Sequence, residues 1–188
     1  MKIAFFNTKQ YDQEYFDRAN QNAAHQIHYF ASHLDLESTS LISDEKVVCA
    51  FINDNLNTEV LHQLKNKGIA LIALRSAGFN HVDIACAKQL SLPVVRVPAY
   101  SPYAVAEHAV GLLLCLNRGI HRAHNRIREG DFSLRDLMGF DLHGKTIGVV
   151  GTGKIGQAFS SIMLGFGCNV IAYDVVHNEE CVKSGVTY

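Results

Sequence analysis

Short apolar runs alternate with helical patterns over the first hundred residues of the chain. Between the runs, apolar positions recur at helical spacing in three segments, and Gly68 follows the second segment where a C-cap glycine belongs. Strands and helices that alternate with short connections predict a parallel, doubly wound α/β sheet. We therefore expect residues 1–100 to form one small α/β domain. The predicted strands are residues 2–7, 26–31, 47–52, 70–74 and 94–97, and the predicted helices are residues 11–20, 58–67 and 82–89.

Pro98 and Pro102 bracket the end of this domain. Ser101 offers a side-chain N-cap with Pro102 at the first helical position, and the pattern then predicts one long helix over residues 101–129. Its first half is apolar nearly all round, so we expect it to be buried on most sides. Its second half is basic, and the chain's net charge of −1 favours a solvated or subunit-contacting face over a nucleic-acid-binding one. Glycines then mark a looped arm, which completes a linking segment over residues 101–144.

The segment 145–188 carries the most informative motif of the chain. An apolar run leads directly into Gly-x-Gly-x-x-Gly at Gly151, Gly153 and Gly156, a helical pattern follows, and a second apolar run ends on Asp174. A strand, a glycine turn, a helix, a strand and an acid in this order are typical of the first βαβ unit of a dinucleotide-binding Rossmann domain. A structural turn that binds no ligand is the alternative.

Each residue type in the motif has a physical reason. Gly151 permits the tight turn, Gly153 lets the backbone approach a pyrophosphate, and Gly156 allows the helix to pack closely on the strand. Asp174 lies 18 residues beyond Gly156, where a carboxylate accepts hydrogen bonds from a ribose and repels a 2′-phosphate. No arginine follows it, because the next two residues are valines. The motif therefore favours NAD over NADP.

The sequence predicts only the first part of a dinucleotide-binding fold. A full Rossmann domain contains two βαβαβ halves, but only two strands are predicted between residue 145 and Tyr188. Such a pair of strands would expose unpaired hydrogen-bonding edges. We therefore expect the chain to be the N-terminal part of a longer protein.

Composition narrows the class of protein. The hydrophobic fraction of 48% is ordinary for a globular protein, and the near-zero net charge argues against nucleic acid or an anionic membrane as a partner. Five scattered cysteines, odd in number, suit free thiols in a reducing compartment such as the cytoplasm. The N-terminal apolar run is too short for a signal peptide, and the most apolar stretch, 104–116, is too short to span a bilayer. We predict no metal site.

Two further segments carry a family resemblance. Residues 73–83 place a glycine loop, with Ala77 and Gly78, after a predicted strand, and residues 97–109 form a junction that contains Tyr100. Together with the glycine motif and its acid, they resemble the NAD-dependent D-2-hydroxyacid dehydrogenases over all 188 residues. The similarity is closest to the fermentative D-lactate dehydrogenases, and Tyr100 is its most discriminating detail.

The resemblance implies a flavodoxin-like substrate domain followed by a Rossmann domain for NAD. It implies that the backbone N–H groups of Ala77 and Gly78 hold the substrate carboxylate, as consecutive N–H groups in a turn can do, and that Tyr100 faces the substrate. The structural alternatives are a turn glycine for Gly78, a packed aromatic at the hinge for Tyr100 and an ordinary core residue for Val105. Arg75 is a tempting substrate ligand, although structural pairing is the more common role of a strand-end arginine. For the cofactor, the resemblance implies that Val105 lies near the nicotinamide and that Lys154 and Ile155 lie over the pyrophosphate. The glycines of the motif and Asp174 complete the implied cofactor site.

The family's catalytic arginine, acid and histidine match no position of this chain. We therefore assign no catalytic residue, and expect the 188-residue chain to be inactive alone. The expected whole protein is a D-lactate-dehydrogenase-like oxidoreductase that transfers a hydride between NADH and pyruvate or a similar 2-keto acid, as a homodimer through the 101–129 helix. A glyoxylate- or hydroxypyruvate-type reductase, and a non-enzymatic NAD-sensing interaction protein, remain alternatives. The histidines left without such a role are His81, His108, His121 and His124.

Overall fold

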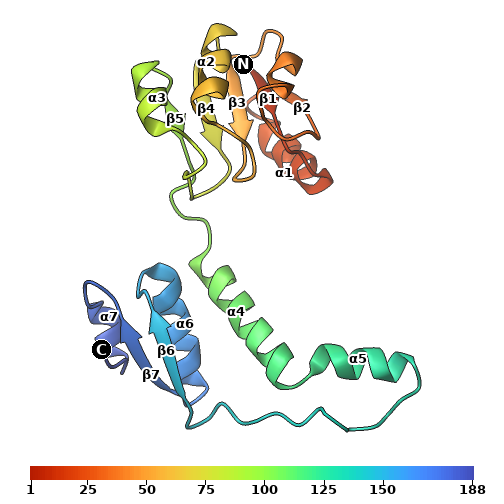
Figure 1. Ribbon diagram of the computed structural model, residues 1–188, viewed down its shortest axis with the longest axis vertical. Helices are drawn as coiled ribbons and strands as arrows, with labels where there is room; N and C mark the ends of the chain where they lie inside the picture. The colour runs from red at the N-terminus through yellow and green to blue at the C-terminus, as the bar shows by residue number, and fades with distance from the viewer. The chain divides into compact units, whose positions relative to one another are not determined.

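The computed structural model describes residues 1–188 as two compact units, Met1–Tyr100 and Ser101–Tyr188. The first unit is a flavodoxin-like α/β fold in which five parallel strands form one sheet of order β2-β1-β3-β4-β5 (Figure 1). All five predicted strands form, and each is shorter than its apolar run. They are β1 (Lys2–Phe5), β2 (Gln26–Tyr29), β3 (Val47–Ala50), β4 (Leu71–Leu74) and β5 (Val94–Val95).

The helices of this unit begin at side-chain caps. Asn57 accepts a hydrogen bond from the backbone N–H of Val60 at 3.0 Å, and Asp83 accepts one from Cys86 at 2.9 Å. The cap at Asp83 explains why the third helix begins two residues later than its apolar pattern predicts. Gly68, at φ +81°, ends the second helix as expected. The elements are α1 (Gln10–Asn20), the 3-10 helix η1 (Ser38–Leu41), which was not predicted, α2 (Thr58–Asn66) and α3 (Ile84–Gln89).

The sheet of the first unit is covered on both faces. Phe6 is fully buried in the main core together with Leu64 of α2 and Ile72 of β4. Phe5 points to the opposite face, where its ring lies 4.7 Å from that of Phe16 in α1. This alternation follows from the two-residue repeat of a strand, and burial of both faces is typical of parallel sheets.

The second unit begins the Rossmann-type fold. Its strands β6 (Thr146–Val150) and β7 (Asn169–Tyr173) pair in parallel, and α6 (Lys154–Gly165) connects them (Figure 1). A smaller core contains Met163 of α6 and Val170 of β7 together with Val110 of the preceding helix. The remaining helices are α4 (Pro102–Asn117), α5 (Ile120–Arg128) and α7 (Glu179–Lys183).

The prediction of one long helix over residues 101–129 is wrong. Ser101 caps α4 and Pro102 opens it as expected, but the helix ends at Asn117 and a second one begins at Ile120. Between them Gly119 adopts the left-handed conformation at φ +57°, which glycine enters without steric cost. The regular pattern across the break concealed this turn.

The expected burial of the first half of that segment is also wrong. Only Ala106 and Val110 of α4 are buried, whereas Leu112 is 52% and Leu116 71% exposed. The physical reason is that α6 packs along α4 on one side, leaving the other apolar positions uncovered in this unit.

The structure describes the state of the cysteines and the length of the apolar helices. All five cysteines are free thiols, and four of them are buried, with Cys115 half-buried. The chain has no helix that is both long and apolar enough to cross a membrane.

We predict that Ile72→Ala lowers the free energy of unfolding of the first unit by about 2–5 kcal/mol, since its fully buried side chain would leave a cavity in the core. Chemical denaturation followed by circular dichroism measures the change. Ile52→Ala is the matched control because Ile52 is 49% exposed, and its effect should stay within about 0.5–1 kcal/mol. Equal losses in the two variants would contradict the described core.

Candidate functional site

The loop after β4 presents free backbone donors. The carbonyl of Ala77 accepts a hydrogen bond from Arg96 Nη1 at 2.8 Å, and that of Gly78 accepts one from Ser76 Oγ at 2.8 Å. The N–H groups of Ala77 and Gly78 make no hydrogen bond within the chain. The loop is therefore held through its carbonyls, while adjacent N–H groups stay available to an anion. Tyr100, at the end of this unit, is 70% exposed.

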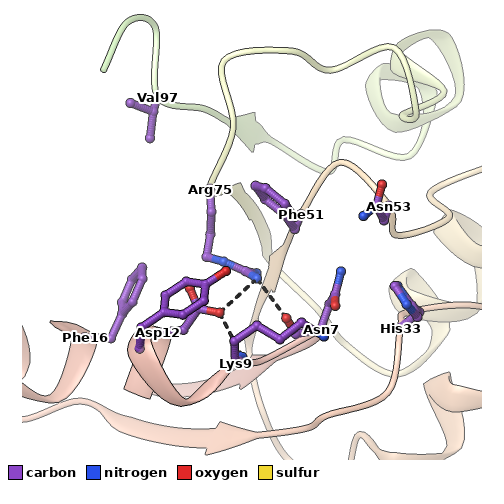
Figure 2. A pocket seen from close by; sticks show the side chains of 10 residues that line it. Asn7, Lys9, Asp12, Phe16, His33, Phe51, Asn53, Arg75 and Val97 are labelled. Atoms are coloured by element: carbon purple, nitrogen blue, oxygen red, sulfur yellow. Dashed lines mark hydrogen bonds and ion pairs between the residues drawn. The ribbon is translucent and has the colours of Figure 1, made fainter. Parts of the chain in front are cut away.

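Arg75 is occupied by structural partners (Figure 2). Its guanidinium donates to the carbonyls of Phe6 at 3.1 Å and Asn7 at 3.2 Å, and lies 3.8 Å from the carboxylate of Asp12. It also stacks over the ring of Phe5 with its Cζ 4.3 Å from the centroid. The structural interpretation of this arginine is confirmed.

In the second unit, two glycines are required by the geometry of the turn. Gly151 adopts φ +95°, which L side chains rarely adopt. A Cβ at Gly156 would lie 1.9 Å from the carbonyl oxygen of Gly151, far inside van der Waals contact. Helix α6 therefore starts immediately against the turn that follows β6. Gly153 has open space around it and serves as the N-cap of α6.

The start of α6 forms a cluster of free donors. The backbone N–H groups of Lys154, Ile155 and Gly156 have no acceptor within the chain, as expected for the first turn of a helix. Because the helix dipole adds positive potential there, this end of α6 is suited to a phosphate group. Ile155 is 47% exposed beside it.

Asp174 is joined to the glycine turn by direct hydrogen bonds. Its Oδ2 accepts from the backbone N–H of Thr152 at 2.6 Å and from the Thr152 hydroxyl at 3.1 Å, and its Oδ1 accepts from the N–H of Val175 at 2.7 Å. The N–H of Thr152 is the main reason that the pKa of Asp174 is below its usual value. The side chain is thus held in place and ionised at neutral pH.

Two residues that support this arrangement were missed from the sequence. Thr152 is 2% exposed and bridges the turn to Asp174. Asn178 donates from its side chain to the carbonyl of Thr152 at 2.9 Å and also caps α7. The position of Thr152 inside the glycine motif was an available signal, whereas the contact of Asn178 depends on the folded loop.

The candidate residues fall in both units. Ala77, Gly78 and Tyr100 belong to the first, and the cofactor candidates belong to the second. Within the second unit the structure brings Asp174 against the glycine turn, and Val105 of α4 is 39% exposed.

Comparison with known proteins gives consistent matches. The model of the D-isomer specific 2-hydroxyacid dehydrogenase catalytic domain matches residues 3–187. The 2-hydroxyacid dehydrogenase homolog 1 of Schizosaccharomyces pombe is 50% identical over 189 residues, which cover 100% of this chain and 57% of the relative.

Solved structures agree with this. The apo structure of D-lactate dehydrogenase from Escherichia coli matches with a TM-score of 0.95 and 46% identity, over 100% of this chain and 60% of that one. D-lactate dehydrogenase with NAD+ from Lactobacillus jensenii matches with a TM-score of 0.75 and 34% identity, over 100% and 57% of the two chains. The chain thus spans somewhat more than half the length of these relatives.

We predict that Gly156→Ala lowers the melting temperature of the second unit, because the added Cβ must displace α6 from the carbonyl of Gly151. A loss of about 1–3 kcal/mol is typical of forced overpacking. Gly165→Ala in the same helix is the control, since no atom lies within 4 Å of its added Cβ. Differential scanning calorimetry compares the two variants, and an unchanged Gly156→Ala transition would show that the close approach is not required.

Proposed function

The chain belongs to the D-isomer specific 2-hydroxyacid dehydrogenase family, and from this we propose that the protein transfers a hydride between NADH and pyruvate or a similar 2-keto acid. The observation that carries the cofactor part is the ionised Asp174 hydrogen-bonded to the glycine turn. The substrate part is supported by the similarity to the D-lactate dehydrogenase from Escherichia coli.

The second unit is suited to NAD. The free N–H groups at the start of α6 would bind the pyrophosphate, with Lys154 and Ile155 beside it. The Oδ1 of Asp174 accepts one hydrogen bond and retains a lone pair for a hydroxyl of the adenosine ribose, and the charge of Asp174 opposes a 2′-phosphate. Val105 would lie near the nicotinamide. The similarity to a D-lactate dehydrogenase with NAD+ supports the same cofactor.

The first unit would bind the substrate. The unpaired N–H groups of Ala77 and Gly78 fit a carboxylate, and the exposed ring of Tyr100 would contact the substrate. The carbonyls of this loop are already occupied, so its orientation does not depend on the ligand. Pre-organised donors of this kind lower the cost of positioning the substrate for hydride transfer.

We further propose a cytoplasmic homodimer that uses α4 and α5. Leu112 and Leu116 of α4 and Ile120 and Ile127 of α5 are each more than half exposed. Such apolar positions on adjacent helices are suited to contact with a second copy. The free thiols support a reducing compartment. Sedimentation velocity tests the assembly, and a monomer at all concentrations would rule it out.

For cofactor choice, we predict that Asp174→Asn in the protein raises the Kd for NADH about tenfold and reduces the preference for NADH over NADPH. Asparagine keeps an acceptor for Thr152 but removes the charge that repels a 2′-phosphate. Fluorescence titration measures both cofactors. Glu179→Gln, a similar loss of charge at an exposed position, should leave both affinities unchanged. An unaltered preference in Asp174→Asn would contradict the assigned role.

For the reaction, we predict that the 188-residue chain shows no steady-state turnover of NADH with pyruvate. None of its histidines matches the motif of a family general acid, and reduction of the keto group requires a proton donor to the developing alkoxide. Absorbance at the NADH band measures turnover. In the whole protein, pyruvate should be reduced with a higher kcat/KM than glyoxylate or hydroxypyruvate, and the reverse order would overturn the substrate assignment.

A further inference from the structure

Arg96, which follows β5, is attached by its side chain to the loop after β4. Its Nη1 donates a hydrogen bond to the carbonyl of Ala77 at 2.8 Å, and its Cζ lies 5.4 Å from the centroid of the Phe79 ring. The charge of Arg96 meets no carboxylate within the chain, since the arginines that form ion pairs are Arg75, Arg126 and Arg135. Its polar contact is therefore with the loop that is proposed to bind the substrate carboxylate.

The carbonyl of Ala77 and the N–H of Gly78 belong to the same peptide unit. A peptide unit is planar and trans, so its C=O and its N–H point in opposite directions. The hydrogen bond from Arg96 fixes the carbonyl on one side and thereby directs the N–H of Gly78 to the other side. That N–H makes no hydrogen bond within the chain. Arg96 thus sets the direction of a free donor.

The two neighbouring peptide units are held in the same way. The N–H of Val97 donates to the carbonyl of Ser76 at 3.2 Å, and this directs the N–H of Ala77. The Ser76 hydroxyl donates to the carbonyl of Gly78 at 2.8 Å, and this directs the N–H of Phe79. Both of these N–H groups are also free within the chain. Three consecutive peptide units therefore combine a bonded carbonyl with a free N–H, an arrangement suited to an anion.

Arg96 is the charged donor among the three groups that hold the loop. A hydrogen bond from a charged donor is roughly twice as strong as one between neutral groups. Donation to a carbonyl also polarises the peptide unit, and this strengthens its N–H as a donor. The bond to the Ala77 carbonyl therefore orients the N–H of Gly78 and makes it a better donor to a carboxylate.

The contact with Phe79 offers a structural role for Arg96. The side chain of Phe79 is 41% exposed, and a cation over an exposed aromatic ring stabilises a fold only slightly. The same arrangement occurs at Arg18, whose Cζ lies 5.7 Å from the centroid of the Tyr15 ring. Arg96 has the additional bond to a carbonyl. The two arginines therefore provide a matched comparison.

We propose that Arg96 is a positioning residue for the carboxylate of the 2-keto acid and acts through the Ala77–Gly78 peptide unit. This inference rests on the proposed function of the loop, to which it adds the cationic group that orients and polarises the donor. The carboxylate is present in the ground state and in the transition state alike. Loss of Arg96 therefore weakens substrate binding more than it slows hydride transfer.

Steady-state reduction of pyruvate by NADH in the whole protein tests the proposal. Arg96→Met removes the donor and keeps an apolar stem over Phe79. It should raise the KM for pyruvate about tenfold and change kcat by less than about twofold. Arg18→Met, the same substitution over Tyr15, should leave the KM unchanged. An equal KM in the two variants overturns the proposal.

Two further variants separate positioning from folding. Arg96→Lys and Arg96→Gln both keep a hydrogen-bond donor, but only the lysine keeps the charge. The KM for pyruvate should increase in the order wild type, Arg96→Lys, Arg96→Gln, while the melting temperature and the Kd for NADH stay the same. Equal KM values in these two variants, or a rise in KM that only follows a fall in melting temperature, overturn the proposal. The pair keeps the test available if Arg96→Met folds poorly.

Two outcomes distinguish failure of the proposed function from failure of the role of Arg96. Absence of turnover of any 2-keto acid with NADH by the wild-type whole protein contradicts the proposed function, and the role of Arg96 falls with it. Turnover by the wild type with an unchanged KM in Arg96→Met contradicts only the role of Arg96.

Discussion

The parallel pairing of the strands is the constraint on which the rest of the structure depends. Parallel strands place all their carboxyl ends at one edge of a sheet, so the loops that follow them are neighbours. In the first unit, this edge carries Gly78 after β4 and Arg96 after β5. In the second, it joins Gly151 after β6 to Asp174 after β7. Both units are built so that binding groups gather at that edge.

Most of the groups available to ligands are backbone N–H groups, and this explains the residue types around them. A helix can present its first turn to a ligand only if the preceding loop approaches closely, and Gly156 allows this because any Cβ would meet the carbonyl of Gly151. Side chains then orient the backbone. Ser76 holds the loop at Gly78, and Thr152 holds the glycine turn against Asp174.

Much of the fold could be predicted from local pattern. The strands of both units follow from apolar runs, and the glycine turn follows from its motif with Asp174 at the right spacing. The break between α4 and α5 could not be predicted, because a single left-handed residue, Gly119, interrupts a helical pattern that otherwise continues. The exposure of Leu116 was missed for a related reason, since hydrophobicity alone does not say how many elements cover a helix.

The sequence by itself determined the α/β class, the resemblance to the dehydrogenase family and the dinucleotide motif, because these depend on residue type and spacing. Only the tertiary structure decided which polar side chains are already engaged. Arg75 and Asp174 both follow strands, yet the guanidinium of Arg75 is bonded to carbonyl oxygens, whereas Asp174 keeps a free lone pair on Oδ1. The positive φ of the buried Asn7 was likewise not evident from the sequence, because its burial and φ arise from contacts between segments far apart along the chain.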